Sequence, residues 1–145
     1  MFEYRILVVD DFAPFRDVVS RIFAESQALP DLLVVREASD GLAAVREAEI
    51  FQPHLTLLDI GLPYLNGIEA ARRVRTVAPE SKLIFISSYC SAAMVREAMS
   101  TGAYGYVVKF DVLCDLPAAI ESVIRDRQFI SKRVAGYDFS ASVDL

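Results

Sequence analysis

The sequence predicts a doubly wound α/β domain, in which a parallel sheet lies between two layers of helices. Five short apolar runs stand at intervals suited to strands, and a segment of helical period follows each run. Nearly continuous hydrophobicity is typical of strands that are buried on both faces, as in a parallel sheet. Alternating strands and helices joined by right-handed crossovers build this architecture.

The five predicted strands are short and rich in branched apolar residues. They span Tyr4 to Val9, Leu32 to Val35, Leu55 to Leu58, Leu83 to Ile86, and Tyr104 to Val108. The first predicted helix follows with one apolar stripe, made by Phe15, Val18, Val19, Ile22 and Phe23. The spacing of i, i+3, i+4, i+7 and i+8 places these side chains on one face, which we expect to dock on the sheet.

Local signals mark the ends of the other helices. Asp40 is a candidate N-cap for the second helix, and the third opens after Asn66-Gly67. The fourth runs from about Ser91 to Ser100 and stops at Gly102, a typical helix terminator. The fifth contains Pro117, which we expect in its first turn, where a missing N–H is tolerated.

Composition and charge narrow the function classes. The chain has 145 residues, 54% of them hydrophobic, and a formal net charge of −5. One compact domain is expected over residues 1–130, and residues 131–145, without a clear period, are expected to be a tail or the start of a linker, with no output domain. The acidic balance argues against direct binding of nucleic acid or an anionic membrane.

The sequence also bears on compartment and on metal chemistry. No apolar run approaches the length of about 18 residues that a membrane span needs. The two cysteines and the single histidine lack zinc-ligand spacing, and a reducing compartment is the simpler interpretation. We therefore expect a cytoplasmic protein.

Polar residues follow four of the predicted strands at the point where each strand ends. Asp10-Asp11 follow the first strand, Asp59 the third, Ser87 the fourth and Lys109 the fifth. The carboxyl ends of parallel strands open on one edge of the sheet, so these side chains are expected to converge on one pocket. Taken singly, each has an ordinary structural role as a helix cap, a turn former or a surface residue. Their coincidence at corresponding places favours a functional site.

The chemistry of this set points to a phosphoryl group. Three carboxylates at one site repel one another unless a cation is present, and oxygen ligands without His or Cys suit Mg²⁺, with Mn²⁺ as a substitute. A metal, an ammonium group and a hydroxyl together stabilise the charge of a phosphoryl group in transfer. Asp59 is the better acceptor by position, because the adjacent Asp10 and Asp11 are more naturally metal ligands.

From about Tyr4 to Arg127, the sequence resembles the receiver domain of two-component response regulators. The motifs that carry the resemblance are Ile6-Leu7-Val8-Val9-Asp10-Asp11, Leu57-Leu58-Asp59-Ile60-Gly61-Leu62-Pro63 with Asn66-Gly67, Ile86-Ser87-Ser88, and Gly102-Ala103-Tyr104-Gly105-Tyr106-Val107-Val108-Lys109. Together they are highly specific, although each alone is weak. The resemblance implies a flavodoxin-like fold with five helices and strand order 2-1-3-4-5.

The resemblance also implies a role for each site residue. Asp59 would accept a phosphoryl group from the phosphohistidine of a sensor histidine kinase. Asp59, Asp11 and the Gly61 backbone carbonyl would bind Mg²⁺ directly, and Asp10 through water.

The remaining implied roles concern the bound phosphoryl group and the response to it. Lys109 would contact a phosphoryl oxygen. Ser87 and Tyr106 would act as the switch: Ser87 would move toward the phosphoryl group, and Tyr106 would rotate inward. The face formed by the fourth helix, fifth strand and fifth helix would then change, altering partner or dimer contacts.

Other features refine this interpretation. Ser88 stands where the family usually has Ala or Gly, and Phe110 where many members have a proline after a cis peptide bond. Gln128-Phe129-Ile130-Ser131 looks most like the LuxR-type branch, whose output domains bind DNA. The domain would be a phosphoacceptor that catalyses only its own phosphotransfer and slow autodephosphorylation.

Two functions from other classes compete with this one. A phosphohydrolase with an aspartyl-phosphate intermediate commonly has a second acid two residues after the nucleophile, where this chain has Gly61. A flavodoxin-like carrier would need a phosphate-binding loop after the first strand, where Asp10-Asp11 would repel the flavin phosphate.

Overall fold

The computed structural model describes residues 3–30 and 32–136. Its six strands are β1 (Tyr4–Val9), β2 (Leu33–Ala38), β3 (Leu55–Leu58), β4 (Lys82–Ser87), β5 (Gly105–Val108) and β6 (Phe129–Ile130). They form one parallel sheet with the order β2-β1-β3-β4-β5-β6. The predicted doubly wound sheet with order 2-1-3-4-5 is confirmed, and a sixth strand extends it beyond β5.

The helices alternate with the strands along the chain, and the last helix follows the last strand. They are α1 (Ala13–Glu25), α2 (Gly41–Phe51), α3 (Gly67–Val77), α4 (Ala92–Met99), α5 (Val112–Ile124) and the short α6 (Lys132–Ala135), with a 3-10 turn, η1 (Lys109–Asp111), before α5. Asp40 caps α2 as expected, because its side chain accepts the N–H of Ala43 at 2.8 Å. Among the described residues, none of the helices combines the length and apolar character needed to cross a membrane.

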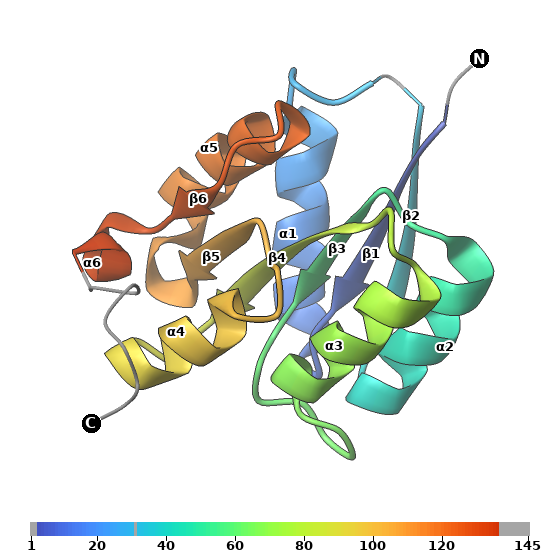
Figure 1. Ribbon diagram of the computed structural model, residues 1–145. Coiled ribbons are helices and arrows are strands. Elements are labelled where there is room, and N and C mark those ends of the chain that lie inside the picture. Colours follow the sequence, from blue (N-terminus) through green and yellow to red (C-terminus); the bar gives the residue numbers. More distant parts are fainter. Residues whose placement is uncertain (1–2, 31, 137–145) are drawn as a thin grey trace.

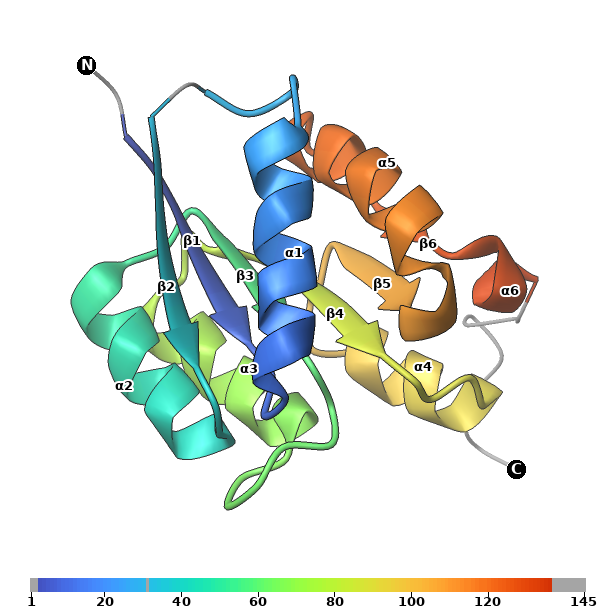
Figure 2. The same cartoon turned by 180° about the vertical axis from the view of Figure 1, so that it is seen from behind.

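The helices cover both faces of the sheet. Figures 1 and 2 show α1 and α5 on one face, with α2, α3 and α4 on the other. Alternate strand residues point into two cores. One core contains Val19 and Phe23 of α1 with Leu116 and Ile120 of α5. The other contains Ala44, Ile68 and Val74 of α2 and α3, with Val95 of α4.

Two expectations about the C-terminal third need correction. Residues 131–136, expected in a tail, include the helix α6, whose Val134 is fully buried in the core. The remainder of the predicted tail, 137–145, lies outside the described residues. Pro117 lies inside α5 rather than in its first turn. It still stands in the N-terminal half of the helix, where its missing N–H deprives only the Leu113 carbonyl of a helical partner.

Candidate functional site

The predicted site residues meet at the carboxyl edge of the sheet. Asp10 follows β1, Asp59 follows β3, Ser87 ends β4 and Lys109 follows β5. Backbone bonds extend the ladder past the strand ends, since the N–H of Asp10 donates to Ala38 at 3.1 Å and that of Asp59 to Val9 at 3.1 Å. The strands therefore hold these side chains at fixed places.

Three carboxylates form a compact acidic cluster. One oxygen from each of Asp10, Asp11 and Asp59 lies within 4.8 Å of the others. Asp10 and Asp59 are buried, whereas Asp11 is exposed. Such a cluster carries up to three negative charges in a partly desolvated environment. The repulsion between these charges is unfavourable unless cations lie nearby.

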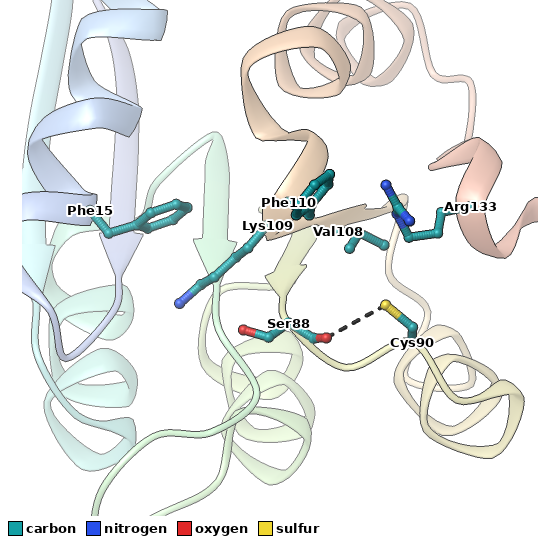
Figure 3. Close-up of a pocket in the computed structure, with 7 residues that line it drawn as sticks. All are labelled: Phe15, Ser88, Cys90, Val108, Lys109, Phe110 and Arg133. Atoms are coloured by element: carbon teal, nitrogen blue, oxygen red, sulfur yellow. Dashed lines mark hydrogen bonds between the residues drawn. The ribbon is translucent and has the colours of Figure 1, made fainter.

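Lys109 is the cation nearest to this cluster. Its Nζ lies 2.7 Å from Asp10 Oδ2 and 2.9 Å from Asp59 Oδ2. The same Nζ stands 4.6 Å from the ring centre of Phe15 on α1, and Figure 3 shows the two side chains reaching toward each other. A favourable cation–π contact thus adds to the two ion pairs that orient the ammonium group.

The electrostatics are those of a crowded acidic site. Burial raises the pKa of Asp59, and the negative charge of Asp10 raises it further. The hydrogen bond and positive charge of Lys109 and the hydrogen bond from the Ile60 N–H lower this pKa, but they do not cancel the rise. Burial would lower the pKa of Lys109, but its interactions with Asp10 and Asp59 outweigh burial and raise it. The raised pKa of Asp59 beside a paired lysine shows that burial, with a smaller contribution from the charge of Asp10, outweighs the stabilisation that Lys109 gives to the carboxylate.

The loop after β3 shapes the surroundings of Asp59. The Ile60 N–H donates to Asp59 Oδ1 at 2.7 Å, and the Gly67 N–H donates to the Ile60 carbonyl at 2.7 Å. A Cβ on Gly67 would lie 1.9 Å from the Asp59 carbonyl oxygen, so this close approach requires glycine. Gly61 is exposed, and the Tyr89 ring lies near it. The loop is therefore held tightly at both of its ends.

Ser87 and Tyr106 meet at the segment that follows β4. The Ser87 hydroxyl accepts the N–H of Tyr89 at 3.1 Å, and the Tyr106 hydroxyl donates to the Tyr89 carbonyl at 2.7 Å. Tyr106 is fully buried, and burial raises its pKa to about 12. Both predicted switch residues are therefore hydrogen-bonded to the backbone of Tyr89, one to its N–H and the other to its carbonyl.

The acidic cluster fits a hard divalent cation by its donor set. All three side chains offer carboxylate oxygens, the ligands that Mg²⁺ prefers. The buried Oδ2 of Asp10 is ion-paired with Lys109 but makes no well-formed hydrogen bond among the described residues. A group that donates to or coordinates this oxygen would relieve its desolvation. The residues present thus suit a metal, which they would hold between β1 and β3.

A pocket of about 580 Å³ adjoins the site. Its lining consists of Phe15, Ser88, Cys90, Val108, Lys109, Phe110 and Arg133, drawn in Figure 3. Ser88 and Phe110, the two departures noted in the sequence, both belong to this lining. The Lys109–Phe110 peptide bond is trans, because no peptide bond within the described residues is cis. The chain instead turns into η1 directly at Lys109.

Sequence reasoning missed three side chains that support the site. Phe15 was assigned only to the apolar stripe of the first helix. The Arg16 Nη1 donates to the Asp10 carbonyl at 2.6 Å, and the buried Ser131 hydroxyl contacts the end of β5. Phe15 and Ser131 are far along the chain from their partners, whereas Arg16 lies six residues from Asp10 but bonds a backbone carbonyl, which no sequence pattern marks. The apolar pair Phe129-Ile130 does mark a short strand before Ser131.

Comparison with known proteins agrees with the fold. The family model for the response regulator receiver domain matches residues 6–121. The transcriptional regulatory protein DegU of Brevibacillus brevis is 35% identical over 119 residues, which cover 82% of this chain and 48% of DegU. A protein-glutamate methylesterase/protein-glutamine glutaminase of Thermotoga maritima is 42% identical over 107 residues, 72% of this chain and 30% of that protein.

A solved structure gives the same result in three dimensions. The two-component response regulator of the LuxR family from Aurantimonas sp. SI85-9A1 superposes with a TM-score of 0.83 and 28% identity, covering 94% of this chain and 95% of that one. The fold and site thus define a signalling domain of the flavodoxin-like class. The chain belongs to the receiver domains of two-component response regulators. It spans about half the length of DegU.

Proposed function

We propose that Asp59 is the phosphoacceptor of this receiver domain and that Lys109 and Ser87 assist the transfer. The observation that carries the proposal is the placement of Asp59 in the acidic cluster, with Lys109 Nζ 2.9 Å from its Oδ2. Asp59 is buried at the end of a central strand, whereas Asp11 is exposed and Asp10 precedes the first helix. This position leaves Asp59 oriented for an incoming phosphoryl group.

The proposed step is a phosphoryl transfer from histidine to aspartate. A carboxylate oxygen of Asp59 forms a bond to phosphorus while the phosphorus–nitrogen bond of the donor phosphohistidine breaks. The electron pair of the broken bond stays on the imidazole nitrogen. Lys109 moves from pairing with the carboxylate to pairing with a phosphoryl oxygen, which stabilises the charge spread over the equatorial oxygens.

The domain uses Mg²⁺ in this proposal, and Mn²⁺ is a substitute. Asp11, Asp59 and the Gly61 backbone carbonyl would hold the ion directly, and Asp10 would hold it through water. When bound, the ion would neutralise part of the negative charge on the phosphoryl oxygens. The support is the all-oxygen donor set and the incompletely bonded Oδ2 of Asp10.

Ser87 and Tyr106 convert the modification into a change of surface. A phosphoryl group adds nearly two negative charges and new acceptor oxygens. When the Ser87 hydroxyl turns to donate to it, the Tyr89 N–H loses its acceptor, and Tyr89 also accepts the Tyr106 hydroxyl. Tyr106 is fully buried, with its hydroxyl bonded to the Tyr89 carbonyl. A phosphoryl group can shift the population of such arrangements only by interacting differently with each of them.

The class of relatives supports a proposal for the cellular role of the domain. A sensor histidine kinase or a phosphotransfer protein in the cytoplasm donates the phosphoryl group, and the domain passes the signal through partner or homodimer contacts. DegU is a transcriptional regulatory protein, which supports control of transcription through an output domain in a longer protein. The receiver itself contacts neither nucleic acid nor membrane, and it acts as a phosphoacceptor with slow autodephosphorylation rather than as a turnover enzyme.

Mass spectrometry of the intact protein tests the acceptor. Incubation with acetyl phosphate and Mg²⁺ is expected to add about 80 Da, the mass of one phosphoryl group. The Asp59→Asn variant, with a native circular dichroism spectrum, should show no adduct, and Asp126→Asn, at the opposite edge of the sheet, should label like the unmodified protein. Undiminished labelling of Asp59→Asn would remove Asp59 from the role.

A further inference from the structure

Ser131 continues the sheet at the end of β5 with its side chain. β6 pairs with β5 through Gly105 and Tyr106, and the Ser131 N–H then donates to the Tyr106 carbonyl at 2.9 Å. One step further along β5, the Val108 N–H donates to the Ser131 hydroxyl oxygen at 3.0 Å. Both Ser131 and Val108 are buried. The hydroxyl thus takes the place of the next strand carbonyl.

Asp115 fixes the orientation of this hydroxyl. The Ser131 hydroxyl donates to Asp115 Oδ2 at 2.7 Å, from the N-terminal half of α5. With its hydrogen directed at the carboxylate, the oxygen presents its lone pairs to the Val108 N–H. The three groups therefore form a directed chain from α5 through the C-terminal segment to β5. Hydrogen bonds to a charged acceptor are stronger than neutral ones, which favours a rigid arrangement.

This chain of hydrogen bonds ends one residue before Lys109. The backbone of Val108 determines where the Lys109 side chain begins, and the Lys109 Nζ must reach two carboxylates at 2.7 and 2.9 Å. Without the Ser131 hydroxyl, the buried Val108 N–H would lose its partner and the end of β5 would be free to shift. A displacement of about 1 Å at a reacting group is enough to slow a reaction by orders of magnitude.

We propose that Ser131 is a positioning residue for Lys109, held in its working orientation by Asp115. The proposal rests on the proposed function, because it assigns these residues to the same phosphoryl transfer. It gives the C-terminal segment after α5 a part in the chemistry, although that segment contributes no side chain to the acidic cluster.

A second contact joins the same segment to the loop after Lys109. Arg133 on α6 binds Asp111 through two hydrogen bonds of 2.9 and 3.1 Å, and its guanidinium lies 4.7 Å from the Phe110 ring centre (Figure 3). Arg133 and Phe110 are exposed, so this contact is screened by solvent and contributes less than a buried one. The buried Ser131 bond therefore carries the positioning.

The test compares labelling rates of variants under acetyl phosphate and Mg²⁺. Ser131→Ala is expected to slow labelling about ten-fold, the size of effect typical of coupled neighbours. The matched control is Ser81→Ala, which removes another buried hydroxyl, bound to Thr56 at 2.8 Å, at the amino edge of the sheet. Ser81→Ala should label at the unmodified rate. Thermal unfolding of both variants measures any common loss of stability.

A double variant separates positioning from a general structural role. In the Lys109→Gln background, Ser131→Ala should cause no further loss, because the residue acts only through the lysine. Asp115→Ala removes the acceptor but keeps the backbone bonds of Ser131, so it serves if Ser131→Ala does not fold. It should slow labelling about three-fold, again only when Lys109 is present.

Two outcomes would overturn the proposal. One is an unmodified labelling rate in the foldable variants, and the other is an equal additional loss in the Lys109→Gln background. Failure of the proposed function has a different signature, since either the unmodified protein would acquire no phosphoryl group or the Asp59→Asn variant would label as fast as the unmodified protein.

Discussion

Two lysines at opposite edges of the sheet have nearly the same local surroundings but different electrostatic situations. Lys109, at the carboxyl edge, is 21% exposed, and its Nζ lies 4.6 Å from the Phe15 ring centre. Lys82, at the amino end of β4, is 24% exposed, and its Nζ lies 5.4 Å from the Tyr104 ring centre. Each also forms an ion pair with aspartate.

The difference lies in the carboxylates that the two lysines meet. Lys82 pairs with Asp126, whose side chain is 74% exposed, and donates to the Val123 carbonyl at 3.1 Å. Lys109 pairs with Asp10 and Asp59, whose side chains are only 3% and 11% exposed. Water screens the first carboxylate, whereas the other two share one cation in a low-dielectric environment. An excess of buried negative charge therefore distinguishes the carboxyl edge of the sheet from the amino edge.

Neutral groups at the amino edge reinforce this contrast. The buried hydroxyls of Thr56 and Ser81 are hydrogen-bonded to each other at 2.8 Å, and the backbone N–H of Arg5 donates to His54 Nδ1 at 2.9 Å. These groups are satisfied within the protein and require no added ion. Asp10 Oδ2, at the carboxyl edge, is buried without a well-formed hydrogen bond among the described residues. Burial of a polar group thus does not by itself indicate a functional site. A buried polar group whose hydrogen bonding and charge are only partly compensated by its neighbours does indicate one.

Neutralising each lysine in turn gives the largest expected effect. Lys109→Gln should slow labelling by acetyl phosphate about a hundred-fold, because the transferred phosphoryl group loses a charged partner in a water-poor site. Lys82→Gln, matched in exposure and aromatic contact, should label at the unmodified rate. Time courses of the intact mass measure both rates. Equal slowing of the two variants would show that lysine acts through fold stability and would remove the contrast between the edges.

The parts of the site that follow strand ends were predictable from the sequence. Asp10, Asp59 and Lys109 each come directly after an apolar run, and parallel strands bring such positions to one edge. β2 was harder to delimit, because it continues through the exposed residues Arg36 and Glu37 on the edge of the sheet. An edge strand needs no continuous apolar run, so hydrophobicity alone ended the prediction at Val35.

Long-range contacts account for what sequence reasoning could not supply. β6 has only two residues, too few for any period, so Ser131 was placed in a tail. The Phe15 ring was expected in the apolar stripe, and nothing local indicates that it lies beside Lys109, which is far along the chain. Local sequence patterns predict strands and helix caps, whereas these contacts depend on how the helices pack against the assembled sheet.

Breaking the neutral pair at the amino edge is the next largest effect. Thr56→Val keeps the shape of the side chain but leaves the buried Ser81 hydroxyl without its 2.8 Å partner. The free energy of unfolding should fall by about 1–3 kcal/mol, the cost of an unsatisfied buried polar group. Urea denaturation measures this loss. Labelling of the folded protein should be unchanged, and a slower rate would mean that the two edges are coupled.

Removing the charge of Asp59, the proposed phosphoacceptor, should have the smallest effect and one of opposite sign, because burial raises the pKa of Asp59 above its ordinary value of 3.8. A raised folded-state pKa gives stability below the unfolded pKa that is lost as pH rises through the folded one, so ionised Asp59 is a cost at pH 7. Without Mg²⁺, Asp59→Asn should raise the melting temperature at pH 7, and raise it less as the pH falls toward 4. Differential scanning calorimetry measures the shift. Excess Mg²⁺ should stabilise the unmodified protein more than the variant. A variant that melts no higher at pH 7 would show that Lys109 alone balances the cluster.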